Sequence, residues 1–309
     1  MKIVVSEFMD ETALSGFSNE DQVLYAPGLV DDRGALLGEL ADADALIVRN
    51  RTQVNQELLD AAPNLQVVGR LGVGLDNIDL DTCASRQVAV CPATGANTLS
   101  VAEYVITAAL VLVRGAYHSA AEMQAGDWPR NALIGGEVSG RCLGLWGFGG
   151  IARAVAVRAQ ALGMTIAAYD PFVAADDPVW SGIQRCESGD ELLQQSDVLS
   201  LHVPLTDSTR NLIDAAAIAK MPAGAVLINT ARGGVVDETA VAEALRSEAL
   251  GGAALDVFES EPLTEDAASR FKDVPNLILT PHIAGVTKEG NVRVSSVTVE
   301  NVKRVLNHG

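Results

Sequence analysis

The feature that most constrains this chain is a glycine-rich turn near its middle. Residues 147–152 have the pattern G-x-G-x-x-A, follow the apolar run Leu143–Trp146, and open an alanine-rich segment that ends near Leu162. Glycines there let the backbone turn tightly and approach a pyrophosphate, whose charge the following helix N-terminus stabilises. The setting predicts a dinucleotide site after a strand. Its expected residues are Gly147, Phe148, Gly149, Gly150 and Ile151.

An acidic residue completes this pattern. Asp170 ends the next apolar run, Thr165–Tyr169, about 20 residues after the first glycine, where dinucleotide-binding folds place the acid that binds a ribose hydroxyl. A carboxylate there accepts hydrogen bonds from a free 2′-hydroxyl and repels a 2′-phosphate. The expected cofactor is therefore NAD, not NADP.

Short β-branched or aliphatic runs alternate with helix-like segments along the whole chain. This alternation predicts an α/β fold with two doubly wound parallel sheets, a flavodoxin-like unit and a Rossmann unit, with a binding cleft between them. Ser100 and Glu103 form a capping-box pattern that predicts a helix start, with the helix ending near Gly115, and Thr287–Leu306 is a second helical pattern. We expect a discontinuous substrate domain, 1–98 plus 287–309, and an NAD domain, 99–286.

Composition excludes several classes of protein. The 22 basic and 40 acidic residues give a net charge of −18, which argues against nucleic acid. No apolar run approaches the ~20 residues of a membrane span. The N-terminus resembles no secretion signal, so we expect a cytoplasmic protein. The four scattered cysteines predict reduced thiols, and no metal-ligand spacing is present.

Polar side chains gather after three later runs, where the carboxyl ends of parallel strands bind ligands. These segments are 229–238, 254–262 and 280–285, and they contain Arg232, Glu261 and His282. Together with the glycine turn they resemble the D-isomer-specific 2-hydroxyacid dehydrogenase family, most closely its phosphoglycerate dehydrogenase branch. The resemblance covers nearly all of the chain.

The resemblance implies a catalytic set whose chemistry suits a 2-hydroxy acid. Arg232 would hold the substrate carboxylate bidentately and fix C2 against the nicotinamide. His282 would take the hydroxyl proton during oxidation and return it in the reverse reaction. Glu261 would orient the imidazole and favour its protonated form.

The resemblance also extends the cofactor site beyond the glycine turn. His202, Val203 and Pro204 follow another apolar run and match the family's cofactor pocket, and Asp256 matches the residue that binds the nicotinamide carboxamide. The remaining expected cofactor contacts are Thr209, Thr230, Ala231 and Gly285.

Several arginines and a second glycine-rich loop indicate a strongly anionic substrate. Val73 and Gly74 lie in a loop whose backbone N–H groups can bind an anion, and they match the family's substrate loop. The other expected substrate residues, apart from Arg232 and His282, are Arg49, Arg70, Asn97 and Arg130. In the phosphoglycerate dehydrogenase branch, arginines matching Arg49, Arg70 and Arg130 bind the substrate phosphate, the last one from a partner subunit.

Two departures leave the acid open. The chain ends at Gly309, so the regulatory C-terminal domain of many serine-pathway relatives is expected to be absent. After His282 it continues Ile283-Ala284-Gly285 instead of a Gly-Ala-Ser-Thr type run. Both 3-phosphoglycerate and (S)-sulfolactate therefore fit the expected anion site.

Proteins with this fold and similar residues have other functions. One alternative is a glyoxylate or hydroxypyruvate reductase. Another is a non-catalytic NAD-sensing corepressor, although the retained Arg232, Glu261 and His282 favour an enzyme. Formate dehydrogenases have glutamine where Glu261 stands. By resemblance, the apolar helix 101–113 is expected to contribute to a homodimer interface.

Overall fold

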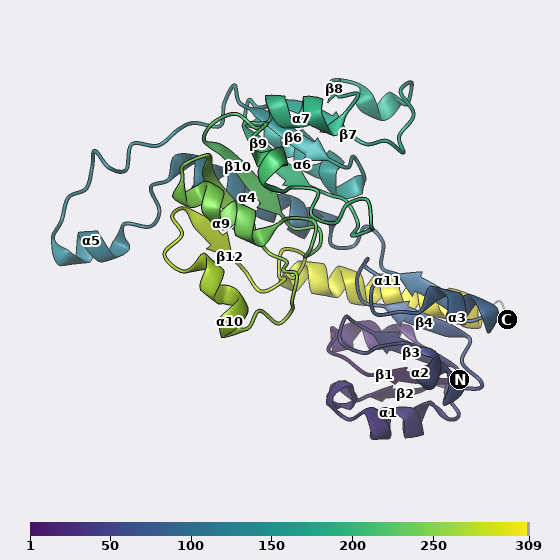
Figure 1. Cartoon of the computed structure of the whole chain (residues 1–309). Coiled ribbons are helices and arrows are strands. Elements are labelled where there is room, and N and C mark those ends of the chain that lie inside the picture. The colour runs from purple at the N-terminus through teal and green to yellow at the C-terminus, as the bar shows by residue number, and fades with distance from the viewer. Residues whose placement is uncertain (308–309) are drawn as a thin grey trace. The chain divides into compact units, whose positions relative to one another are not determined.

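The computed structural model describes residues 1–307, which form two compact units (Figure 1). One unit consists of Met1–Asn97 and the segment that begins at Val286, and the other of Thr98–Gly285. Both boundaries between the units lie one residue before the boundaries expected from the sequence. His308 and Gly309, the end of the expected substrate domain, lie outside the described residues.

The first unit is built on a five-stranded parallel sheet in the order β2-β1-β3-β4-β5. Its strands are β1 (Lys2–Val5), β2 (Gln22–Tyr25), β3 (Ala45–Val48), β4 (Val67–Arg70) and β5 (Ala89–Pro92). Its α-helices are α1 (Arg33–Leu40), α2 (Gln56–Asp60), α3 (Leu80–Ser85) and α11 (Lys288–Leu306), and its 3-10 helices are η1 (Glu11–Gly16) and η2 (Pro27–Asp31).

Alternate residues of the strands in this unit fill two separate cores. Val4, Leu46 and Val68 pack with α1, α2 and α3 on one face. Ile3, Ile47 and Val67 pack with residues of α11 on the other. Because both faces are covered, the strands are continuous apolar runs and do not alternate with polar residues.

The second unit is built on a seven-stranded parallel sheet in the order β12-β11-β10-β9-β6-β7-β8. Its strands are β6 (Cys142–Trp146), β7 (Thr165–Tyr169), β8 (Gln184–Arg185), β9 (Val198–Leu201), β10 (Ala225–Asn229), β11 (Leu250–Leu255) and β12 (Leu277–Leu279). Its helices are α4 (Thr98–Arg114), α5 (Ala120–Ala125), α6 (Gly150–Ala161), α7 (Gly189–Gln195), α8 (Ala215–Ile218), α9 (Glu238–Arg246) and α10 (Glu265–Ala268), with η3 (Pro178–Trp180) and η4 (Ser269–Phe271).

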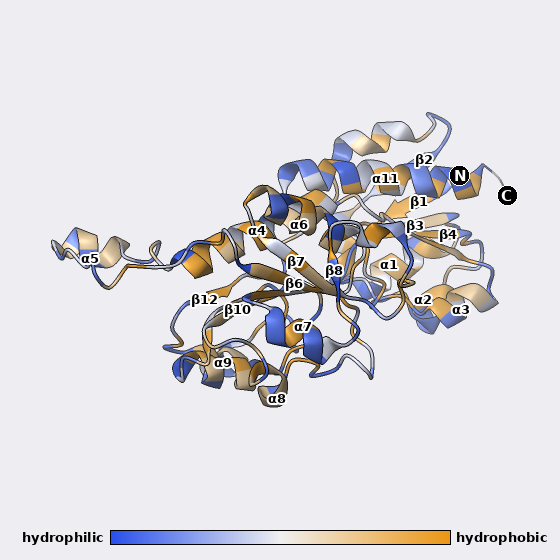
Figure 2. Cartoon of the chain, turned by 90° about the horizontal axis from the view of Figure 1, so that it is seen from above, coloured by the Kyte–Doolittle hydropathy of each residue, from blue (hydrophilic) through white to orange (hydrophobic). Residues whose placement is uncertain are grey.

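This sheet also separates two cores. Helices α4 and α6 cover one face, and α7, α8 and α9 cover the other. Figure 2 shows apolar colour along the central strands of this unit, with mixed colouring on its helices. The strand order reverses at β6, which lies between β9 and β7, so ligands are expected beyond the carboxyl end of β6. The two doubly wound α/β sheets predicted from the sequence are confirmed.

The predicted start of α4 is wrong. Helix α4 begins at Thr98, so Ser100 is its third residue and lies inside the helix, where it is buried. The expected capping pattern therefore falls within the first turns of the helix and not at its start.

Helix α5 was not predicted. It lies at the end of an extended segment that carries it away from the sheet of its own unit (Figure 1). We refer to residues 115–137 as the arm. Three of its large apolar side chains are strongly exposed, namely Tyr117 (69%), Trp128 (76%) and Ile134 (78%).

Within residues 1–307, no helix is both long enough and apolar enough to cross a membrane. All four cysteines are free thiols. Burial raises the pKa of each thiol, that of Cys186 to about 11, so these side chains are protonated packing groups near neutral pH.

Candidate active site

The glycine turn after β6 has the space that a pyrophosphate requires. Gly147 has a φ of +87°, and a Cβ there would lie 2.5 Å from the backbone oxygen of His202. Only glycine fits this close approach. At Gly149 and Gly150 an added Cβ would meet no atom within 4 Å, so the start of α6 faces open space. The turn can therefore accept a phosphate group at a helix N-terminus.

Asp170 is bonded to this turn at the end of β7. Its Oδ2 accepts a hydrogen bond from the Phe148 N–H at 2.8 Å, and its Oδ1 accepts one from the Phe172 N–H at 2.9 Å. Each carboxylate oxygen has a further lone pair, so a ribose hydroxyl can still donate to Asp170. Its role toward the cofactor stays a prediction, and its role in fixing the turn is an additional finding.

Two predicted cofactor residues have side chains suited to a polar but uncharged ligand. The hydroxyl of Thr230 is buried and makes no hydrogen bond to the described residues. Burial lowers the pKa of His202 to about 4, so its ring is neutral near pH 7, and its Nε2 lies 3.0 Å from the Ser200 hydroxyl. Both observations fit the amide and hydroxyl groups of a dinucleotide.

The remaining predicted cofactor residues lie in the same unit. Thr209 fixes the loop after β9, because its hydroxyl donates to the Pro204 carbonyl at 2.7 Å. The Ala231 N–H donates to Asn229 Oδ1 at 3.0 Å, which closes the turn after β10. Ile151 and Val203 are partly buried, and Gly285 is the last residue of the unit.

Two of the three predicted catalytic residues touch each other. His282 Nδ1 lies 2.8 Å from Glu261 Oε2, and Glu261 Oε1 accepts the Phe258 N–H at 3.0 Å. Burial raises the pKa of Glu261. The hydrogen bonds from His282 and Phe258, with the charges of His282 and Arg232, outweigh burial and hold that pKa below its usual range. The carboxylate is therefore ionised where it meets the imidazole.

His282 has an unusual backbone conformation that Asp256 supports. Its φ is +55°, which is uncommon outside glycine. Asp256 is 1% exposed and accepts hydrogen bonds from the N–H groups of Ile283 and Ala284, both at 2.8 Å, and from the Thr280 hydroxyl at 2.6 Å. The His282 N–H donates to the backbone oxygen of Asp256 at 2.8 Å. Asp256 thus holds the histidine turn, a function that the sequence did not indicate, and its predicted contact with the carboxamide stays untested.

Arg232 joins this pair from the turn after β10. Its Nη1 donates to the Ala231 carbonyl at 2.6 Å, and its own carbonyl accepts from Asn229 Nδ2 at 3.0 Å. Its charge contributes to the lowered pKa of Glu261. The loops that follow β10, β11 and β12, which are adjacent strands, therefore bring a guanidinium, a carboxylate and an imidazole together.

Arg49, a predicted substrate residue of the first unit, lies in a loop that a buried acid holds. Glu7 is 4% exposed and accepts hydrogen bonds from the backbone N–H groups of Arg49, Arg51 and Thr52 at 2.9, 3.2 and 2.9 Å. The Arg49 guanidinium donates to the Phe8 carbonyl at 3.2 Å and to Asn291 Oδ1 at 3.0 Å. Burial lowers the pKa of Arg49, opposed by the charge of Glu7. Arg49 is thus a partly buried cation that donates hydrogen bonds to two neutral oxygens and lies near the charge of Glu7.

The other predicted substrate residues differ in their surroundings. Arg70 donates to the Leu71 carbonyl at 2.7 Å, and Val73 is exposed in the loop that follows. Gly74 is partly exposed in that loop, and Asn97 Oδ1 is buried without a hydrogen-bond partner among residues 1–307. Arg130 lies in the second unit, exposed on the arm, where it lines a pocket of about 470 Å³ with Trp128 and Arg114.

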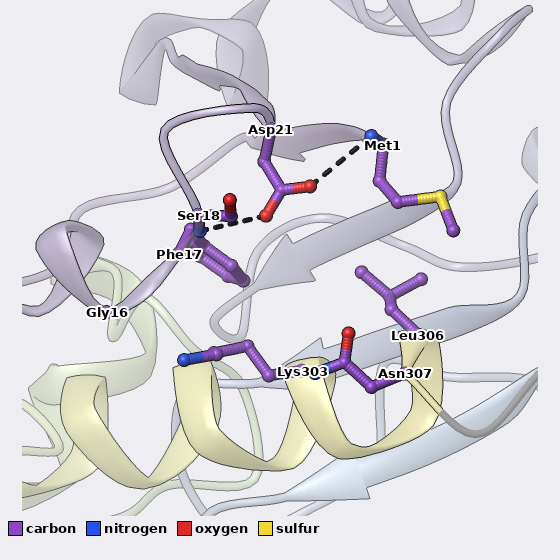
Figure 3. Close-up of a pocket in the computed structure, with 8 residues that line it drawn as sticks. All are labelled: Met1, Gly16, Phe17, Ser18, Asp21, Lys303, Leu306 and Asn307. Atoms are coloured by element: carbon purple, nitrogen blue, oxygen red, sulfur yellow. Dashed lines mark hydrogen bonds and ion pairs between the residues drawn. The ribbon is translucent and has the colours of Figure 1, made fainter.

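A different pocket, of about 330 Å³, lies in the first unit between the N-terminal residues and the end of α11 (Figure 3). The Met1 ammonium lies 3.3 Å from Asp21, and Lys303 of α11 and Asn307, which follows that helix, line the same pocket. The eight residues drawn there include none of the predicted site residues. Nowhere in residues 1–307 is a group of three or more His, Cys, Asp or Glu side chains placed to hold a metal.

Comparison with known proteins identifies the class to which this geometry belongs. Residues 106–284 match the model of the D-isomer specific 2-hydroxyacid dehydrogenase NAD binding domain. A solved structure from Thermus thermophilus, the TT0316 protein, superposes with a TM-score of 0.88 at 32% identity, covering 100% of this chain and 97% of that one. The chain belongs to the D-isomer specific 2-hydroxyacid dehydrogenase family. It is an NAD-dependent oxidoreductase that acts on a 2-hydroxy acid.

The chain is also similar over most of its length to two curated proteins. The chain is 56% identical over 304 residues to the (S)-sulfolactate dehydrogenase of Chromohalobacter salexigens, covering 98% of each chain. It is 36% identical to the D-3-phosphoglycerate dehydrogenase of Methanocaldococcus jannaschii, covering 99% of this chain but 57% of that protein. The chain thus spans little more than half of that phosphoglycerate dehydrogenase and nearly all of the sulfolactate enzyme.

Proposed function

We propose that the protein oxidises (S)-sulfolactate or a closely similar three-carbon 2-hydroxy acid with a second anionic group, using NAD and giving the 2-oxo acid. The observation that carries this proposal is the contact between Glu261 and His282 beside Arg232. The relative named (S)-sulfolactate dehydrogenase supports sulfolactate as the acid. This ranks sulfolactate above 3-phosphoglycerate, which the sequence left equal.

The proposed mechanism gives each of the three residues one task. Because Nδ1 of His282 faces the Glu261 carboxylate, Nε2 carries the lone pair and takes the proton from the substrate hydroxyl. The ionised Glu261 stabilises the imidazolium that forms. Arg232 binds the substrate carboxylate and holds C2 in place. NAD supplies the hydride acceptor at its nicotinamide ring.

We also propose the division of labour between the units. The second unit would bind NAD through the turn at Gly147, Asp170, the loops at His202 and Thr230, and Asp256. The first unit would contribute Arg49, Arg70, Asn97 and the backbone at Val73 and Gly74 to the acid. The buried Oδ1 of Asn97 and hydroxyl of Thr230, which lack partners in the described chain, support these assignments, because buried polar atoms are ordinarily hydrogen-bonded.

Arg49 supports a substrate with a second anion. The hydrogen-bond partners of this partly buried guanidinium are neutral, so no carboxylate occupies its N–H groups, although the nearby charge of Glu7 offsets part of its attraction for an added sulfonate or phosphate. Arg51 differs, because it is ion-paired with Asp31 on the surface. We therefore assign the second anion to Arg49 and not to Arg51.

A panel of acids tests this function directly. NADH formation would be followed with (S)-sulfolactate, 3-phosphoglycerate, D-glycerate, D-lactate and D-malate, and NADH consumption with glyoxylate and hydroxypyruvate. The proposal expects the highest kcat/KM with sulfolactate. A higher value with D-lactate or glyoxylate would contradict the second-anion site, and NAD binding without turnover of any acid would favour a sensor.

We propose that the protein is a homodimer in the cytoplasm. The arm presents Trp128 and Ile134 to solvent around the pocket that contains Arg130, Tyr117 is exposed elsewhere on the arm, and such apolar exposure is typical of an interface. In this proposal a second copy covers the arm, with the helix α4 contributing. Sedimentation of Trp128→Ser should show monomer where the wild type is dimeric, while Phe172→Ser, at a 95% exposed position off the arm, should remain dimeric.

A further inference from the structure

A buried acid lies directly behind the loop that carries Glu261. Glu238 is the first residue of α9, and its side chain is 5% exposed. Its Oε1 accepts the Glu259 N–H at 2.6 Å, and its Oε2 lies 3.3 Å from Arg270 Nη1. Burying a carboxylate costs free energy unless it is paired and hydrogen-bonded, and here both partners are present.

Glu238 is not required to begin its helix. Asp237 already caps α9, because its side chain accepts the N–H groups of Thr239 at 2.9 Å and Ala240 at 3.0 Å. The Glu238 carboxylate instead turns toward the loop after β11. Burial, with the charges of Glu259 and Asp237, raises the pKa of Glu238 above its usual range, although the Glu259 amide and Arg270 act to lower it. Its ionisation therefore depends on the two groups that it contacts.

The peptide that Glu238 binds is held from a second side by Gly233. A Cβ on Gly233 would lie 1.7 Å from the Phe258 oxygen and 2.8 Å from the Glu259 nitrogen, so the Phe258–Glu259 peptide packs directly on the residue after Arg232. The other end of Phe258 is also held, since its N–H donates to Glu261 Oε1. Three contacts thus fix the four residues that end at Glu261.

We propose that Glu238, paired with Arg270, is a positioning residue: it locks the Phe258–Glu259 peptide so that the Glu261 carboxylate meets His282. The inference rests on the proposed catalytic pair, because a positioning role has meaning only if Glu261 acts on His282. The side-chain contacts of Glu238 are with the Glu259 N–H and Arg270, so it would act on His282 through the loop.

A double-mutant cycle tests this role. Glu238→Ala leaves a buried N–H and Arg270 without their partner, and we expect kcat to fall about 10- to 100-fold, because small misplacements of catalytic groups cost this much. The acid limb of the pH–rate profile for oxidation should move to lower pH, as for Glu261→Gln, since the imidazole loses its anionic partner. In a Glu261→Gln background the same change should lower kcat by less than about 3-fold, because coupled residues are not additive.

Controls separate positioning from a general structural effect. Glu243→Ala removes an exposed acid from the same helix and should leave kcat and the pH profile unchanged. Glu238→Asp keeps the charge but shortens the side chain, and it should shift the profile in the same direction by a smaller amount. If Glu238→Ala does not fold, Glu238→Asp carries the same cycle.

The outcomes distinguish the two proposals. A full loss from Glu238→Ala in the Glu261→Gln background, or an unmoved acid limb in the single variant, would overturn the positioning role while leaving the Glu261–His282 pair intact. An unmoved acid limb in Glu261→Gln itself would overturn the proposed pair.

Discussion

The two units prepare their ligand-facing residues in different ways. In the second unit, Glu261 and His282 are bonded to each other at 2.8 Å, and Arg232 adds its charge to the same carboxylate. In the first unit, Arg49 donates to a carbonyl and an amide oxygen. In the proposed function, the residues that carry the chemistry are therefore assembled before substrate arrives, whereas the residue proposed to select the acid donates to neutral oxygens.

Both units nevertheless use the same device to fix these loops. Glu7 accepts three backbone N–H groups behind Arg49, and Asp256 accepts two behind His282. Each acid is buried and follows a strand. A buried carboxylate can hold a loop more firmly than a neutral acceptor, because charge-assisted hydrogen bonds are the stronger ones.

The largest expected effect comes from removing the proposed base. His282→Asn should lower kcat about 1,000-fold, within the range for loss of general acid–base catalysis, with NAD binding retained. His118→Asn, at an exposed position in the same unit, is the matched control. Stopped-flow hydride transfer and NAD titration would measure both; a His282→Asn enzyme with more than a tenth of the wild-type rate would contradict the assignment.

Gly233→Ala should have the next largest effect. The added Cβ would meet the Phe258 oxygen at 1.7 Å, so the loops of Arg232 and Glu261 must separate. We expect kcat to fall about 100-fold, as for misplaced catalytic groups. Gly38→Ala, where an added Cβ meets nothing within 4 Å, should be silent. Wild-type turnover in Gly233→Ala would show that the two loops do not need this contact.

Asp170→Asn tests the proposed cofactor site of the second unit. The amide oxygen can still accept the Phe148 N–H, but the Phe172 N–H then faces the amide NH2 and loses its acceptor, and the charge that favours a ribose hydroxyl is lost. We expect the KM for NAD to rise about 10-fold, the effect of one charge-assisted hydrogen bond, with kcat for the bound complex unchanged. Steady-state kinetics with NAD and NADP would measure this. An unchanged KM for NAD would remove Asp170 from the cofactor site.

The smallest predicted effect is a pH dependence of stability. The pKa of His202 is lowered to about 4 in the folded protein, against 6.5 unfolded, so the neutral ring contributes stability above pH 6.5 that is lost as pH falls toward 4. His202 is partly exposed as a residue, so solvent screening limits the loss to about 1 kcal/mol. Urea unfolding at pH 7 and pH 4.5 should show it, and His202→Asn should reduce the difference. An equal pH dependence in that variant would place its origin elsewhere.

Much of the fold was predictable because its signals are local. The turn at Gly147 lies between a strand and a helix that both show in the sequence, and the apolar runs correspond to strands with small shifts at their ends. The start of α4 was not predictable from Ser100 and Glu103, because both residues lie inside the helix, which begins at Thr98. Helix α5 and the arm around it were not predicted, because their sequence shows no clear helical or strand periodicity.

The meeting of the three expected catalytic residues could be predicted, but the buried acids that hold their loops could not. Arg232, Glu261 and His282 follow successive strands, so parallel topology alone places them at one edge. Glu7, Asp256 and Glu238 hold backbone groups from distant parts of the chain, and no spacing rule indicates which N–H a buried acid will accept. Asp256 was therefore assigned only to the cofactor, and Glu7 and Glu238 to nothing.

The measurement that tests the account most directly is the ratio of kcat/KM for (S)-sulfolactate to that for D-glycerate, in wild type, Arg49→Ala and Arg51→Ala. We predict that Arg49→Ala lowers this ratio about 10- to 100-fold, as expected for loss of a charge-assisted contact, while Arg51→Ala, whose guanidinium is bound to Asp31, leaves it within about 3-fold. Equal losses on both acids in Arg49→Ala, or a larger change in Arg51→Ala, would contradict the claim that Arg49 selects the second anion.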